Sequence, residues 1–156
     1  MNRVLTTGLA VAAVALLTGC GNPDEHTIRD PATGQEVTVQ TGSRMQAPRN
    51  LPDFAPIYPG GEIQNVVEST SSGEQGAGLG GMVVFQTDAD LETVARFYRE
   101  RLDASGLSER GDVSMGESMI LTATAADNPA NGVHVTLSPG DSGSGTTVNL
   151  TYTRGS

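Results

Sequence analysis

The sequence predicts an α+β fold in which an antiparallel sheet of about five strands carries one helix packed on one face, in the order β-β-α-β-β-β. Two observations support this. Three segments near the C-terminus alternate apolar and polar residues with a period of two, which is typical of strands with one buried and one solvated face. One segment in the middle of the chain, residues 90–104, instead repeats apolar residues at helical spacing.

The predicted domain covers residues 51–154 and opens with an extended segment, 51–61, that three prolines interrupt. Two strands follow, over residues 62–68 and 82–87. A loop rich in Ser and Gly is expected to join them at 69–81. The large apolar residues of the entry segment are expected to pack on one edge of the core: Phe54, Ile57 and Tyr58.

The helix is expected to begin at Asp90, whose carboxylate suits an N-cap, and to end before Gly106. Its charged residues fall on the side opposite the apolar stripe and read as a solvated surface. Two pairs of opposite charge on that side, Glu92–Arg96 and Arg99–Asp103, are four residues apart and would stabilise the helix only weakly.

Three strands complete the predicted sheet, around residues 119–123, 133–137 and 148–152, and a further strand between residues 107 and 113 is an open option. The polar residues of these strands share the solvated face. Four of them are the candidates for a binding face: His134, Thr136, Asn149 and Thr151.

The composition argues against several classes of function. The chain has 156 residues, a formal net charge of −9 and one cysteine, and all nine of its positive side chains are Arg. A nucleic-acid partner is therefore not expected, because phosphate backbones are held by concentrated positive charge. The single cysteine excludes an internal disulfide and any zinc site built on several thiolates. No catalytic group, metal or cofactor is predicted.

Residues 76–81 match the G-x-G-x-x-G pattern of dinucleotide-binding loops by letter. That pattern needs a helix start directly after it, so that backbone N–H groups face a pyrophosphate. A strand follows here, so the dinucleotide interpretation fails. A small-ligand site under loop 69–81 remains an alternative function.

An enzyme is the less favoured alternative, as a hydrolase using His134 with a nearby carboxylate. His134 is expected on the polar face of a strand, where histidines are more often simply solvated. The other histidine, His26, lies in a segment predicted to be a tether, and no G-x-S-x-G nucleophile motif occurs.

The first 19 residues have the order of a secretory signal peptide. Arg3 precedes an apolar run from Val4 to Leu17, which is shorter than the ~20 residues needed to span a bilayer. A short transmembrane anchor or a buried helix fits the length and the small residues at its end less well.

The next residues, Leu17-Thr18-Gly19-Cys20, resemble the lipobox of bacterial lipoproteins. The resemblance implies cleavage before Cys20 and acyl chains on that residue, which would hold an acidic protein at a membrane. Ordinary secretion with a leftover thiol is the alternative. Gly21 follows, where Asp would retain a lipoprotein in the inner membrane of Gram-negative bacteria. The resemblance thus implies a periplasm-facing envelope protein and, if the cell is Gram-negative, favours the outer membrane over the inner one.

Residues 20–50 are poor in large apolar residues and read as a flexible tether, with turn residues that permit a short hairpin at 27–39. The stretch from Pro56 to Leu107 resembles small uncharacterised domains of bacterial envelope proteins, through Tyr58-Pro59-Gly60 and Val94-Ala95-Arg96-Phe97-Tyr98. That resemblance implies no activity. The favoured function is a non-enzymatic envelope lipoprotein that contacts another envelope protein.

Overall fold

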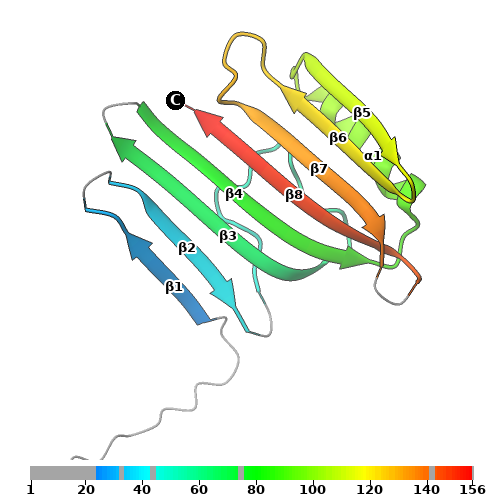
Figure 1. Cartoon of the computed structure of the whole chain (residues 1–156), viewed down its shortest axis with the longest axis horizontal. Helices are drawn as coiled ribbons and strands as arrows, with labels where there is room; N and C mark the ends of the chain where they lie inside the picture. The colour runs from blue at the N-terminus through cyan, green and yellow to red at the C-terminus, as the bar shows by residue number, and fades with distance from the viewer. Residues whose placement is uncertain (1–23, 32–33, 43–44, 74–75, 141–142, 156) are drawn as a thin grey trace, which may run out of the picture.

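One antiparallel sheet of eight strands dominates the computed structural model (Figure 1). The structure describes residues 24–31, 34–42, 45–73, 76–140 and 143–155. The strands lie side by side in the order β1-β2-β3-β4-β8-β7-β6-β5. Their bounds are β1 Asp24–Arg29, β2 Glu36–Thr41, β3 Glu62–Gly73, β4 Gly76–Thr87, β5 Glu109–Met115, β6 Ser118–Thr124, β7 Gly132–Pro139 and β8 Thr146–Gly155. Helix α1, Leu91–Ala104, connects β4 to β5.

The prediction of about five strands in the order β-β-α-β-β-β is wrong, because three further strands join the sheet. Two of them, β1 and β2, form the hairpin within the stretch that reads as a tether, and β2 pairs with β3. The third, β5, forms the opposite edge. All of β1 and nearly all of β5 is exposed, so neither strand shows the apolar alternation that marks a half-buried strand.

The stretch rich in Ser and Gly at 69–81 is also not a loop: it extends β3 and β4 into a long hairpin, whose residues 74 and 75 lie outside the described residues. Serines of β3 face glycines of β4, with Ser69 opposite Gly80 and Ser71 opposite Gly78. The glycines also pair with β8 on their other side. Hydrogen bonding on both edges of β4 thus overrides the low strand propensity of glycine.

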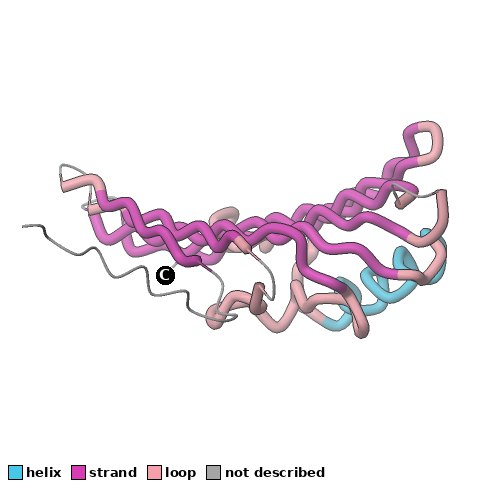
Figure 2. Tube along the Cα trace, turned by 90° about the horizontal axis from the view of Figure 1, so that it is seen from below, coloured by secondary structure: helices cyan, strands magenta, loops and turns pink. Residues whose placement is uncertain are grey.

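Helix α1 and the segment 45–61 lie on the same side of the sheet and leave its opposite side without a covering helix (Figure 2). We call these sides the covered face and the bare face. The core lies between the covered face and these two elements. Its buried residues are Ala55, Val66, Val83, Phe85, Val94, Ala95, Tyr98, Leu102, Leu107, Met119, Leu121, Ala123, Val133, Val135, Leu137, Val148, Leu150 and Tyr152.

The helix begins and ends as the sequence predicts. The Asp90 carboxylate caps its N-terminus by accepting from the Thr93 backbone N–H at 2.9 Å, and this bond lowers the pKa of Asp90. Gly106 follows the C-terminus with a φ of 76°. Halfway along the helix, the buried Tyr98 hydroxyl donates to the Pro56 carbonyl at 2.9 Å. That bond ties segment 45–61 to α1, and Phe54, Ile57 and Tyr58 pack against the core as predicted.

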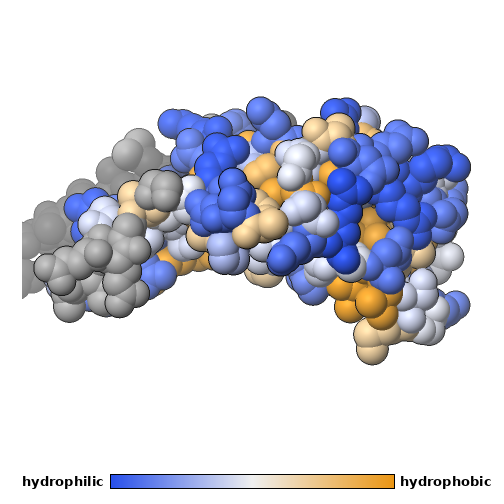
Figure 3. Space-filling model, turned by 90° about the horizontal axis from the view of Figure 1, so that it is seen from above, coloured by the Kyte–Doolittle hydropathy of each residue, from blue (hydrophilic) through white to orange (hydrophobic). Residues whose placement is uncertain are grey.

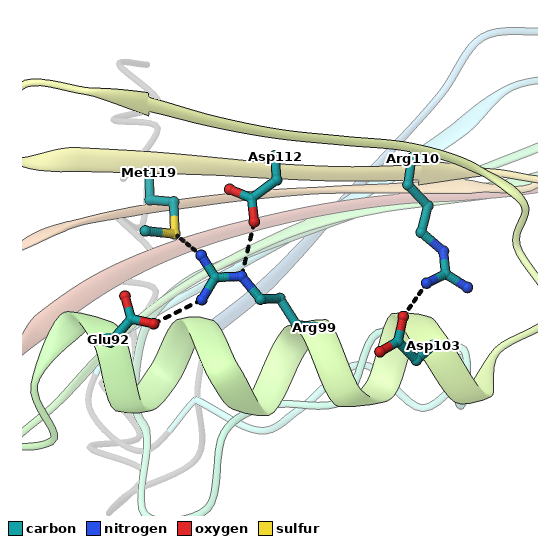
Figure 4. Close-up of polar contacts among 6 residues, drawn as sticks. All are labelled: Glu92, Arg99, Asp103, Arg110, Asp112 and Met119. Atoms are coloured by element: carbon teal, nitrogen blue, oxygen red, sulfur yellow. Dashed lines mark hydrogen bonds and ion pairs between the residues drawn. The ribbon is translucent and has the colours of Figure 1, made fainter.

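The charged side of the helix is not only a solvated surface, because it holds β5 (Figure 4). Arg99 donates to Asp112 of β5 and to Glu92, each at 2.8 Å. Asp103 pairs with Arg110 of β5. The predicted pairing of Arg99 with Asp103 is therefore replaced by two ion pairs from α1 to β5, across two elements that are separate in sequence.

Candidate functional site

A polar pocket of about 340 Å³ lies on the covered face, beside the strands that α1 does not reach. Strands β1, β2 and β3 form its floor, and the segment that leads from β2 toward the core forms its wall. The pocket is lined by Glu25, Gln40, Gln46, Ala47, Arg49, Asn50 and Glu68. Its lining thus combines two carboxylates, one guanidinium and three carboxamides, which is a hydrogen-bonding surface rather than an apolar one.

Glu68 is the acid of this pocket that the fold desolvates. It lies on β3 between Thr38 of β2 and Gly81 of β4, and it shares the covered face with the buried Val66 two residues earlier. Burial raises the pKa of Glu68, the charge of Glu25 raises it further, and Arg49 opposes the shift. A carboxyl group with a raised pKa keeps its proton to a higher pH than an ordinary Glu, and while protonated it can donate as well as accept a hydrogen bond.

Tyr152 of β8 places a second polar group, its hydroxyl, near Glu68 on the side toward the core. Its ring lies over Gly81, where any Cβ would collide with the ring and the hydroxyl. The hydroxyl is buried and has no hydrogen-bond partner within the described residues. Burial and, second, the charge of Glu68 raise the pKa of Tyr152 to about 12. Because Gly81 is the cross-strand neighbour of Glu68, the hydroxyl lies within side-chain reach of the Glu68 carboxyl.

Gln40 fixes the wall of the pocket to its floor. Its side chain is buried on β2, and its carboxamide oxygen accepts from the Gln46 backbone N–H at 3.1 Å. Arg49 lies on the same wall and is exposed, and it forms no ion pair with any described residue. The pocket therefore presents a guanidinium that has no ion-pair partner among the described residues, close enough to the partly desolvated Glu68 carboxyl to oppose the rise of its pKa.

The four predicted binding-face residues lie together on the bare face. Thr151 is opposite His134 and Asn149 is opposite Thr136 on the paired strands β8 and β7. A shallow hollow of about 230 Å³ includes His134 and Thr151. A second hollow of about 600 Å³ runs along the glycines of the β3–β4 hairpin, at the place where the sequence suggested a site under 69–81.

The hydrolase hypothesis required a carboxylate beside His134. The partner that the structure gives this ring is a hydroxyl, with His134 Nε2 at 3.1 Å from Thr136 Oγ1, and no described carboxylate forms an ion pair with it. Within the described ranges, no group of three or more His, Cys, Asp or Glu residues is placed to hold a metal ion. No described helix is long and apolar enough to cross a membrane. The signal peptide and Cys20 lie outside the described residues.

A family model described as START domain-like matches residues 63–147, which is more than half of the chain. The chain belongs to the START domain-like family. No curated protein and no solved structure matches it. The START-like match runs from β3 into the start of β8 and includes α1 and Glu68, whereas β1, β2 and Cys20 precede it.

Sequence reasoning did not single out the pocket residues of this START-like chain. One signal was available: Glu68 is in phase with Val66, so it places an acid on the buried face of a predicted strand. Tyr152 was likewise in phase with Val148 and Leu150 on a buried face. The contribution of Gln40 and Arg49 depends on β2 joining the sheet, which the sequence pattern did not indicate.

Proposed function

We propose that this protein is a lipid-anchored, ligand-binding module of a bacterial envelope, and that its ligand occupies the pocket beside Glu68. The family assignment supports a binding module. The observation that carries the location is that Glu68, a half-buried acid, lines the pocket, while the buried Tyr152 hydroxyl, which has no described hydrogen-bond partner, lies over Gly81, the cross-strand neighbour of Glu68. Perturbed ionisable groups beside a concave surface are characteristic of binding sites.

The charges of the pocket favour a small zwitterionic ligand. Glu25 and Glu68 would bind an ammonium group, and Arg49, which has no described ion-pair partner, would bind a carboxylate or another anion. The carboxamides of Gln46 and Asn50 add donors and acceptors between them. A volume of about 340 Å³ accommodates a molecule of the size of a free α-amino acid.

The proposed anchor would hold this pocket close to the membrane. Only Gly21, Asn22 and Pro23 separate Cys20 from the first residue of β1, so the connecting chain reaches at most ~14 Å when extended. Glu25, the second residue of β1, lines the pocket. With β1 beginning at Asp24, acyl chains on Cys20 would therefore keep the β1 edge and the pocket beside the bilayer surface.

Calorimetric titration tests the pocket. The full chain carrying Cys20→Ser, which removes the acylation site, is titrated with each of the common α-amino acids. We expect heat of binding for at least one of them, and loss of that heat in Glu68→Gln and Arg49→Gln. His134→Ala is the matched control, because it removes a polar ring from the bare face and should leave the heat unchanged. Binding that His134→Ala abolishes and Glu68→Gln preserves would contradict the proposed pocket.

An envelope protein partner is the second candidate function, and the observation that favours it is the bare face. His134, Thr136, Asn149 and Thr151 lie there in two adjacent cross-strand pairs that no helix covers. We propose that this face is the contact surface if such a partner exists. Affinity capture from detergent-solubilised envelopes should then recover a protein that binds the parent chain and fails to bind a Thr151→Arg variant.

A further inference from the structure

The large hydrophobic side chains that remain exposed in the described residues lie on the two edge strands of the sheet. Val113 and Met115 of β5 are 51% and 63% exposed, and Ile28 of β1 is 71% exposed. Figure 3 shows hydrophobic residues gathered at the end of the molecule that carries β5 and β6. An exposed edge strand with apolar side chains is a template for pairing with another strand.

The charges that would protect β5 from such pairing are already neutralised. Inward-pointing charges usually block the addition of a strand, because the new strand would bury them unpaired. On β5 these charges are Arg110 and Asp112, and both are paired with side chains of α1 (Figure 4). The other side of β5 presents Gly111, Val113 and Met115, and its one charged residue is Glu109, at the first position of the strand.

The other edge strand, β1, differs from β5 in its larger number of charged or titratable residues and in its closeness to the proposed anchor. Strand β1 carries Asp24, Glu25, His26 and Arg29 among its six residues, so four of its side chains are titratable or charged. It also begins four residues after Cys20, the proposed membrane anchor. Edge β5 lies at the far end of the sheet from β1. It is therefore the edge that exposes two large hydrophobic side chains and is also remote from the proposed anchor.

We propose that β5 pairs with β5 of a second copy of this chain, antiparallel and centred on Val113, so that the two sheets become continuous across a two-fold axis. In this register Val113 faces Val113 of the second copy. Met115 faces Gly111, where no side chain competes for the space, and Asp112 faces Ser114. Within residues 111–115, two of these pairs bring apolar or small residues together, the third sets Asp112 opposite a neutral hydroxyl, and no like charges face each other.

Neighbouring registers are less favourable. Centring the pair on Asp112 brings the two Asp112 carboxylates face to face, which is destabilising for a cross-strand pair. Centring it on Gly111 sets Val113 opposite Glu109. Centring it on Ser114 leaves only residues 113–115 of each strand in the ladder, because β5 ends at Met115. The sequence of β5 therefore selects the Val113-centred dimer, which has the self-complementary interface of a two-fold axis.

Disulfide trapping tests the register. The full chain carrying Cys20→Ser has no other cysteine, so Val113→Cys introduces a single thiol. Facing residues of an antiparallel pair have Cα atoms about 4.5–5.5 Å apart, within the range that a disulfide spans. We expect mild oxidation to convert Val113→Cys into a covalent dimer on non-reducing gels. Ile28→Cys is the matched control, because its thiol replaces an even more exposed side chain on the other edge, and it should remain monomeric.

Sedimentation velocity of the Cys20→Ser chain tests the association itself. We expect a concentration-dependent dimer that Val113→Lys abolishes, because the change sets two like charges opposite each other, and that Ile28→Lys leaves intact. Circular dichroism of both variants checks that they fold. A monomer at every concentration would overturn the proposal, as would loss of the dimer in Ile28→Lys alone or cross-linking of Ile28→Cys as readily as Val113→Cys.

Discussion

The Tyr152 hydroxyl lies directly over the Cα of Gly81, in the space that a side chain on Gly81 would fill. Glycine at this point of β4 therefore lets an aromatic ring from β8 cross over the neighbouring strand and bring its hydroxyl toward Glu68 on β3. The polar groups of Tyr152 on β8 and Glu68 on β3 therefore lie near each other across β4, on a covered face whose other buried side chains are mainly apolar.

Gly81→Ala should destabilise the protein. The added methyl group would collide with the buried Tyr152 ring, and overpacking of this kind costs about 1–3 kcal/mol. Urea unfolding of both proteins measures the difference. Gly80→Ala is the matched control on the preceding residue, because the nearest atom to its Cβ would be the Ser69 hydroxyl at 3.2 Å, which can rotate away, and the next ones, at 3.5 and 3.9 Å, are at ordinary contact distance. Equal losses in both variants would contradict the packing described for Tyr152.

Glu68→Gln should change how stability depends on pH. The folded protein raises the pKa of Glu68 above its ordinary value of 4.5, so the folded state holds a proton that the unfolded state has released. The contribution of Glu68 is therefore fully present below pH 4.5 and is lost as pH rises through the folded pKa. We expect the free energy of unfolding of the parent to fall, relative to that of Glu68→Gln, as pH rises through this window. Chemical unfolding at a series of pH values measures it, and parallel profiles would show that Glu68 is not desolvated.

Tyr98→Phe should weaken the attachment of the entry segment to the helix. The change removes the hydrogen bond from the Tyr98 hydroxyl to the Pro56 carbonyl and leaves that carbonyl without its partner, which costs roughly 1–3 kcal/mol. The shift of the urea midpoint gives the value. Tyr58→Phe serves for comparison, because it keeps the ring that packs edge-on against Phe97 and against the core, and it should leave the midpoint nearly unchanged. A larger effect from Tyr58→Phe would contradict the assigned role of Tyr98.

Cys20→Ser should release the protein from the membrane. Acyl chains on Cys20 would contribute ~0.8 kcal/mol for each CH₂ buried in the bilayer, and a formal charge of −9 offers no substitute attraction to anionic lipids. Fractionation of cells grown with labelled palmitate follows both label and protein. The parent should carry label in the membrane fraction and the variant should carry none. Label on the variant, or an unlabelled parent, would contradict acylation at Cys20.

Much of the secondary structure was predictable from the sequence, and its arrangement was less so. Helix α1 is marked by its cap at Asp90 and by its apolar stripe, both of which are local signals. Strands β6, β7 and β8 alternate because one side of each is buried. Strands β1 and β5 gave no such signal, since an edge strand whose inward side chains are charged has no apolar period to detect.

The candidate site was harder to predict than the fold, because it is assembled from residues far apart in sequence. Glu25, Gln40, Arg49 and Glu68 meet only because the β1–β2 hairpin pairs with β3. The histidine that attracts attention in the sequence, His134, lies on the bare face beside Thr136 and outside this pocket. Residue type alone therefore pointed to the bare face, whereas the desolvated polar groups lie on the covered face.

The most direct test of the account is the location of ligand binding. Backbone ¹H–¹⁵N spectra of the Cys20→Ser chain are recorded while an α-amino acid that gives heat in calorimetry is added. The account predicts that the amides whose chemical shifts change cluster at Gln40, Gln46, Arg49 and Glu68. In Glu68→Gln, the chemical shifts of the same amides should not change when the amino acid is added. Shifts confined to His134, Thr151 and their neighbours on the bare face, or shifts that Glu68→Gln leaves unchanged, would contradict it.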